Sequence, residues 1–174
     1  MIDLALVWVG IIGLGVLIYV VMDGFDLGIG ILFPFMNGTQ ERDVMMNTVA
    51  PVWDGNETWM VLGGAGLFAA FPLVYSTVLS ALYLPIIFMV VALIFRGVAF
   101  EFRFKATRTK YLWDLAFIWG SILSSFFQGV ILGAYIQGIQ TTNGIYSGGG
   151  WDWFTPFTCF TGLGVVVMYA TLGC

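Results

Sequence analysis

The chain has 174 residues, of which 60% are hydrophobic and 9% are charged, and its mean hydropathy of +0.96 lies far outside the range of soluble globular proteins. It contains no histidine, and its two cysteines lack metal-binding spacing, which argues against haem, copper or zinc held by this chain alone. The net charge of −4 without a basic tract argues against a nucleic-acid partner. This composition predicts an integral membrane protein that is surrounded by lipid.

The first apolar segment runs from Leu4 to Met36 and is interrupted by two acids, Asp23 and Asp26. About 20 helical residues cross the hydrocarbon core, so this segment is long enough to span and must then overshoot or bend. We expect a span over about residues 4–33, with both acids buried or interfacial, because ionisable residues inside spans usually face protein or water. The alternative is a helix that ends at Met22, which would leave an apolar tail too short to span.

The next apolar run has no charged residue from Met60 to Phe95. This run is too long for one crossing of the membrane. It is too short for two crossings and a turn unless the first of the two helices begins before Met60. We therefore predict spans over about residues 49–71 and 73–95, with the turn between them at Pro72. Pro51 fits the first turn of such a helix, where its missing N–H costs nothing. The many glycines and alanines of this helix predict that it is buried in a bundle.

Asp54 and Glu57 enter the membrane in this scheme, about one turn inside the predicted helix. They are three residues apart and therefore share a helix face. A carboxylate within a span costs about 2.5–3.5 kcal/mol on insertion scales, so a function or a partner must compensate. Asp54 could act as a proton relay. It could instead stay ionised in a structural role, as the partner of a cation such as Arg96 or Arg42 or as the acceptor of helix-terminal N–H bonds.

Two further spans are predicted over about residues 113–136, where Gln128 is the polar member, and 157–174. The fold class is therefore all-α, a polytopic transmembrane helical bundle of four full spans and a truncated fifth, forming a single domain over residues 1–174. All six basic residues fall in the predicted polar loops 37–47 and 96–110. The positive-inside rule then places both loops in the cytoplasm and the N-terminus outside.

Acids beside glycine-rich spans suggest a path for protons or cations, since such acids persist by pairing, protonation or contact with water. Three classes of protein remain open on this reasoning. The chain could be a proton-coupled transporter, a subunit of a respiratory or photosynthetic complex that conducts protons to a cofactor held elsewhere, or a scaffold subunit whose acids are paired structurally.

Four motifs narrow this choice: Asp23-Gly-Phe-Asp-Leu-Gly-Ile-Gly30, Ala50-Pro-Val-Trp-Asp-Gly-Asn-Glu-Thr-Trp59, Ala65-Gly-Leu-Phe-Ala-Ala-Phe-Pro72 and Phe95-Arg-Gly-Val-Ala-Phe-Glu-Phe-Arg103. Together they resemble subunit II of the cytochrome bd-type quinol oxidases, close to the cyanide-insensitive branch. The resemblance is strongest from Gly10 to Lys110. Because subunit II of that family usually has eight spans, the resemblance implies that this chain corresponds to the N-terminal half.

The resemblance implies a haem-free subunit of a terminal oxidase in the bacterial cytoplasmic (inner) membrane. Such a complex oxidises quinol and reduces dioxygen to water with protons drawn from the cytoplasm. Its b-type and d-type haems belong to the partner, subunit I, so the expected partners of this chain are subunit I, lipid and quinone. No cofactor is expected on this chain itself.

The resemblance also implies roles for single residues. In the family, the acids that match Asp23, Asp26 and especially Asp54 are associated with proton delivery. Glu57 joins this proton pathway at a lower rank, because other family members can carry an amide there. The tryptophan that matches Trp59 lies near a proposed oxygen route, with an interfacial or packing role as the alternative.

Overall fold

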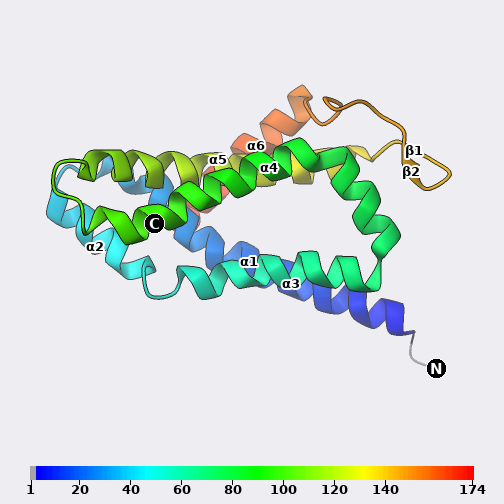
Figure 1. Cartoon of the computed structure of the whole chain (residues 1–174), viewed down its shortest axis with the longest axis horizontal. Coiled ribbons are helices and arrows are strands. Elements are labelled where there is room, and N and C mark those ends of the chain that lie inside the picture. The colour runs from blue at the N-terminus through cyan, green and yellow to red at the C-terminus, as the bar shows by residue number, and fades with distance from the viewer. Residues whose placement is uncertain (1–2) are drawn as a thin grey trace.

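The computed structural model describes residues 3–174 and is built almost entirely of helices (Figure 1). The helices are α1 (Leu4–Leu32), α2 (Thr39–Val49), α3 (Trp53–Ala70), α4 (Pro72–Arg103), α5 (Lys110–Gln137) and α6 (Pro156–Leu172), with a 3₁₀ turn η1 (Phe33–Phe35) after α1. Two short antiparallel strands, β1 (Thr141–Thr142) and β2 (Ile145–Tyr146), lie between α5 and α6. Apart from this hairpin the predicted all-α class is confirmed.

Three helices in the described part of the chain are long and apolar enough to cross a membrane, namely α1 with η1, α4 and α5. Helix α6 is apolar but shorter, and α3 has 18 residues, which corresponds to about 27 Å of helix. The chain is thus an all-α, multi-pass membrane protein.

The helices form two layers that converge at one end of the molecule, where α2 lies (Figure 1). Helix α5 packs against α4 and α6, while α1 packs against α3 and also reaches α5 and α6. The buried residues of α1 begin at Gly15 and concentrate from Asp23 to Ile31. The C-terminal half of α1 is therefore the element around which the other helices assemble.

The helix of the second predicted span does not begin at residue 49. The polar stretch 37–47, expected to be a loop, is largely the helix α2, and a turn separates it from α3, which begins at Trp53. Helix α2 is held by its apolar side, since Met46 and Val49 are fully buried. Pro51 lies in the turn and not in a helix.

The expectation that the second span is buried in a bundle is also wrong for this chain. Helix α3 has three buried residues, Asn56, Gly63 and Gly66. A Cβ added at Gly64 would meet nothing within 4 Å. The small residues of α3 therefore permit close packing, but much of the helix surface is left uncovered by the rest of the chain.

The helix of the third predicted span does not end at residue 95, because α4 continues to Arg103. The expected loop 96–110 shrinks to residues 104–109. The helix passes Arg96 without interruption because this side chain is fully buried and paired with Asp23. Within α4 the backbone departs from helical geometry at Leu82, three residues before Pro85, whose ring cannot join the helical hydrogen-bond ladder.

Helices α1 and α6 approach each other closely at Gly28. A Cβ on Gly28 would lie 2.1 Å from the carbonyl oxygen of Tyr169 and 2.8 Å from the backbone nitrogen of Gly173. Overpacking of this kind costs about 1–3 kcal/mol. We expect Gly28→Ala to lower the thermal unfolding midpoint of the detergent-solubilised protein, whereas Gly64→Ala on the uncovered face should not. An equal loss in the two variants would contradict this assignment of the contact.

Candidate functional site

A buried cluster of charged side chains joins α1 to α4. Arg96 donates a hydrogen bond from Nη1 to Oδ1 of Asp23 at 2.9 Å, and its Nη2 lies 3.8 Å from Oδ2 of Asp26. The side chains of all three residues are fully buried. Asp23 and Asp26 reach the same arginine because residues three apart share one face of a helix.

Helix α3 contributes Asn56 to the same place. Its side-chain amide donates to Oδ2 of Asp26 at 2.8 Å, and Asn56 is itself buried. Asp23, Asp26, Arg96 and Asn56 are called the buried cluster below. The expectation that Asp23 and Asp26 are buried inside the protein is confirmed, although their function remains a prediction.

The buried cluster contains more acidic than basic groups. An arginine side chain stays positively charged in proteins, so Arg96 balances one carboxylate. A second, unbalanced buried carboxylate would be costly as an anion. The arrangement can therefore hold one proton. Within residues 3–174, no group of three or more acidic or sulphur side chains is placed to hold a metal ion.

Several polar atoms of the buried cluster have no hydrogen-bond partner among the described residues. These atoms are Oδ2 of Asp23, Oδ1 of Asp26, and Nε and Nη2 of Arg96. Each such atom typically costs about 1–3 kcal/mol, so the cluster is not arranged for stability alone. A role in chemistry is one accepted reason for keeping such atoms.

A groove of about 440 Å³ lies between α3 and α4, and both Asp54 and Glu57 line it. The prediction that these two carboxylates share a face is confirmed. Trp53 closes one part of the groove by stacking on Phe100, with ring centroids 5.0 Å apart. Glu57 is half-buried and lies within electrostatic range of both Asp54 and Arg96. Glu57 thus brings the acidic groove within electrostatic range of the buried cluster.

The structure corrects two expectations about Asp54. It lies in the first turn of α3 and is exposed in this chain, instead of one turn inside a buried helix. The cations named as its structural partners are engaged elsewhere, because Arg96 pairs with Asp23 and Arg42 pairs with Asp114. Trp59 is half-buried on α3 and is not part of the groove lining, so its place on an oxygen route stays a prediction.

Sequence reasoning missed a hydrogen-bonded chain beside the buried cluster. Gln128 donates from Nε2 to the hydroxyl of Tyr19 at 2.7 Å, and the hydroxyl of Tyr169 donates to Oε1 of Gln128 at 2.8 Å. Tyr19 could have been found, since it lies one turn before Asp23 on the same helix face. Gln128 was recognisable as a polar residue in an apolar span, but nothing in the sequence pattern indicated a hydrogen-bonding role for Tyr169.

A second charged network lies where α2 meets the turn between α4 and α5. The fully buried Arg103 donates to Asp114 and Asp43, and Lys110 donates to Asp43 at 3.1 Å. Arg42 binds Asp114 from the other side at 3.2 Å. This network fixes α2 against the ends of α4 and α5.

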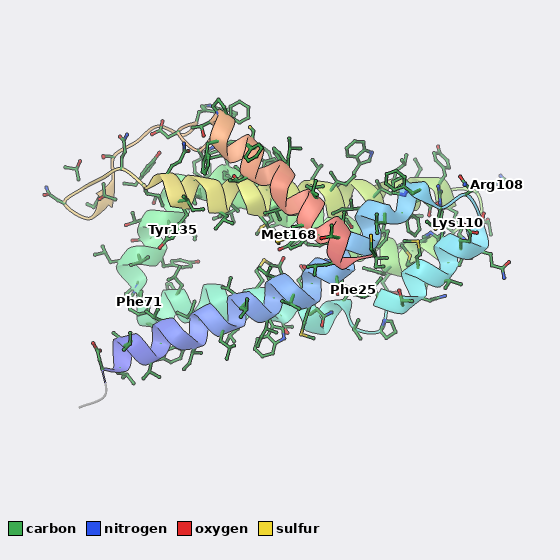
Figure 2. The ribbon with its side chains drawn as sticks, turned by 180° about the vertical axis from the view of Figure 1, so that it is seen from behind. Phe25, Phe71, Arg108, Lys110, Tyr135 and Met168 are labelled. Carbon is green, nitrogen blue, oxygen red and sulfur yellow. The ribbon has the colours of Figure 1, made fainter. Side chains whose placement is uncertain are left out.

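The basic residues gather at this end of the protein. Figure 2 shows Arg108 and Lys110 at the end opposite Phe71 and Tyr135. Arg42 and Arg103 belong to the same end through their bonds to Asp114. Arg96 is the basic residue that lies away from it, inside the buried cluster.

The charged network makes stability depend on pH through Asp43. Partial burial raises the pKa of Asp43, but hydrogen bonds from Lys110 and Arg103 and their charges outweigh it, so the pKa lies below its usual value. A carboxylate with a lowered folded-state pKa contributes stability above its unfolded pKa of about 3.9 and loses it as the pH falls through the folded value.

We therefore expect Asp43→Asn to lower the thermal unfolding midpoint at neutral pH, and we expect this difference to shrink as the pH falls through the lowered folded-state pKa of Asp43. Unfolding scans at neutral and at acidic pH measure the effect. Glu101→Gln serves as the control, since its ion pair with Lys105 is largely exposed and such pairs contribute little. An undiminished effect of Asp43→Asn in acid would contradict the assignment.

Comparison with known proteins gives a consistent result. The family model described as cytochrome bd terminal oxidase subunit II matches residues 4–174 of the chain. This match includes every helix of the structure and all residues of the buried cluster.

Individual relatives agree with that match. The chain is 34% identical to cytochrome bd-I ubiquinol oxidase subunit 2 of Escherichia coli (strain K12), over 98% of this chain and 47% of the relative. It is 40% identical to cytochrome bd ubiquinol oxidase subunit 2 of Bacillus subtilis (strain 168), over 68% of this chain and 36% of the relative. It is also 33% identical to a probable cytochrome oxidase subunit 2 of Haemophilus influenzae, over 88% of this chain and 43% of the relative. The chain spans less than half the length of these relatives.

Proposed function

The chain belongs to the cytochrome bd terminal oxidase subunit II family, and from this membership we propose that it serves in a quinol:oxygen oxidoreductase complex of a bacterial cytoplasmic membrane. Two of its relatives are named as ubiquinol oxidase subunits. The complex would oxidise membrane quinol to quinone and reduce dioxygen to water. This chain is not catalytic alone and supports a partner that carries the redox centres.

The proposed partner is the haem-bearing subunit I, with its b-type and d-type haems. The haems would supply the electron transfer and the oxygen chemistry. The residues of this chain do not fit haem ligation by the usual imidazole, because the sequence has no histidine. The proposed contribution of the chain is therefore structural support and the supply of protons.

One observation carries the proposal of proton delivery: a buried cluster with two carboxylates and one arginine lies within electrostatic range of Glu57, which lines a groove together with Asp54. Asp54 is exposed and can exchange protons with water. Glu57 is half-buried and lies within electrostatic range of both Asp54 and Arg96, so it is placed between the exposed Asp54 and the buried cluster. Asp26 and Asp23 then form the inner end of the proposed pathway, and Trp59 is proposed to border the route of oxygen.

The scaffold alternative is favoured by one feature, the full burial of the Arg96–Asp23 pair. A purely structural cluster, however, gains nothing from a second carboxylate that the arginine does not contact at hydrogen-bond distance. A transporter remains the other alternative for acids inside spans. The family relationship favours the oxidase subunit over both.

The membrane arrangement is part of the proposal. We place four full spans in α1, α3, α4 and α5 and a fifth, truncated one in α6, all within a single domain over residues 1–174. The basic end of the structure, with α2 and residues 104–109, is proposed to face the cytoplasm because of its positive charge. The N-terminus of α1, at the opposite end (Figure 1), is then outside.

The experiment that tests this function is co-expression with a tagged haem-bearing subunit. We expect this chain to co-purify with the haem protein and to show no specifically bound haem, seen as Soret absorbance, when it is purified alone. Gly64→Ala should behave as the wild type. Failure to associate, or one haem per isolated chain, would contradict the proposed division of labour.

A further inference from the structure

Three polar side chains from three helices form a hydrogen-bonded chain that ends at the buried cluster. Tyr169 on α6 donates to Gln128 on α5, and Gln128 donates to Tyr19 on α1, at 2.8 and 2.7 Å. Tyr19 is 5% exposed and Tyr169 is 1% exposed. The proposed pathway from the groove does not use these residues, so their arrangement needs another explanation.

The direction of the hydrogen bonds is the same throughout. Because the Tyr19 hydroxyl accepts from Gln128, its own proton is free, and the group that it interacts with is the carboxylate of Asp23. Oδ2 of Asp23 has no partner at hydrogen-bond distance in the described structure. The free proton of the Tyr19 hydroxyl can therefore be oriented toward this oxygen. It does not conduct protons, because the Gln128 amide keeps both of its hydrogens.

The two carboxyl groups of the buried cluster are therefore unequal. Asp23 accepts a charge-assisted hydrogen bond from Arg96 at 2.9 Å and faces Tyr19. Asp26 accepts from the neutral amide of Asn56 at 2.8 Å, while the guanidinium is 3.8 Å away. Charge-assisted hydrogen bonds are about twice as strong as neutral ones. The anionic form is accordingly better stabilised at Asp23.

We infer that Asp23 stays ionised beside Arg96 and that Asp26 is the carboxyl group that takes up and releases the proton, with Tyr19, Gln128 and Tyr169 as positioning residues that act through Asp23. Uptake forms an O–H bond at the unpartnered Oδ1 of Asp26, and release breaks it, so no other reactant is needed. The inference rests on the proposed function for the destination of the proton.

The other ionisable groups around the pair are few and lie on known elements. They are Tyr19 on α1, Glu57 on α3, Arg96 on α4 and Tyr169 on α6. Glu57 is the one that could be confused with Asp26, because it is also an acid near Arg96. The test is therefore designed in a background in which Glu57 is replaced by glutamine.

The experiment records the infrared carbonyl stretch of protonated carboxyl groups in the assembled complex carrying Glu57→Gln, as the pH is lowered. Asn56→Leu should move the band to higher frequency, because the carbonyl of protonated Asp26 loses its donor. Tyr19→Phe should leave that band in place and add a second, because Asp23 loses a neighbouring hydroxyl dipole and becomes partly protonated. Tyr135→Phe, at an exposed tyrosine of α5 (Figure 2), should change nothing.

The opposite pattern would overturn the inference. A band that moves in Tyr19→Phe and stays in Asn56→Leu would place the proton on Asp23, and no band at any pH that keeps the complex intact would show that neither acid takes it. Asn56→Ala replaces the leucine variant if the latter does not assemble. The spectra need no turnover, so a failure of proton delivery, judged from oxygen consumption, is distinguishable from a failure of this assignment.

Discussion

Asp54→Asn is expected to lower quinol oxidase turnover per haem at least about tenfold in a complex that contains this subunit, which corresponds to about 1.4 kcal/mol in the barrier. Asparagine preserves the shape of aspartate but cannot carry a proton. Asp54 is exposed in the first turn of α3 and lines the groove between α3 and α4. A relay at this entrance must alternate between ionised and neutral forms, and the variant removes that ability.

A structural role for Asp54 predicts a different order of events, in which assembly is lost before turnover. The structure weakens the form of that alternative in which Asp54 pairs with a cation, because Arg96 and Arg42 are already paired with other acids. The form in which Asp54 interacts with helix-terminal N–H groups stays open, since Asp54 lies in the first turn of α3. Oxygen consumption is measured per assembled haem, together with the amount of complex recovered. Glu57→Gln is the matched comparison on the same groove, with a smaller expected effect. Normal turnover per haem in Asp54→Asn would reject the relay.

Arg96→Gln is expected to be the most destabilising substitution in the chain. The side chain is fully buried and lies against two buried carboxylates. Removing one partner of a buried ion pair costs about 3–5 kcal/mol, because the remaining charge is left without compensation. We expect little folded protein in detergent, measured by size-exclusion chromatography and thermal unfolding.

The cause of that loss can be separated from a simple packing defect. In the double variant Arg96→Gln with Asp23→Asn, the uncompensated charge is removed together with the arginine. This double variant should therefore recover part of the lost stability. Arg96→Lys should lie between wild type and Arg96→Gln, since lysine keeps the charge but lacks the planar fork of arginine. A double variant no more stable than the single one would contradict the electrostatic explanation.

The apolar runs of the sequence were sufficient to predict the helical class and the approximate positions of α1, α5 and α6. They were misleading wherever a charge was taken as the end of a helix. Arg96 was assigned to a loop because it is the first charged residue after the uncharged run from Met60 to Phe95, yet its partner Asp23 lies 73 residues earlier in the chain. A single sequence contains no signal for such a distant pairing.

The sequence was sufficient to identify the acidic residues of the candidate site, but not the hydrogen bonds that join them to other helices. Asp54 and Glu57 were placed on one face by their spacing, which the groove between α3 and α4 confirms. The bond from Asn56 to Asp26 could not be foreseen, because it depends on how α3 rotates against α1. The turn that separates α2 from α3 was missed for a related reason, since the buried positions of α2 become evident only in the folded chain.

The long separation between Asp23 and Arg96 also has a consequence for how the protein is made. The ribosome delivers α1, with its two acids, well before α4 emerges, so during this interval neither acid has its arginine. Insertion of α1 must therefore proceed with both acids neutral or still in contact with water. The pair can form only when α4 enters the bilayer. The cost of burying Arg96 there is reduced because the carboxyl groups of α1 are already in place. The contacts of Asp23 and Asp26 with Arg96 thus form late in biosynthesis, and translation arrested before Arg96 would leave both acids of α1 without their arginine.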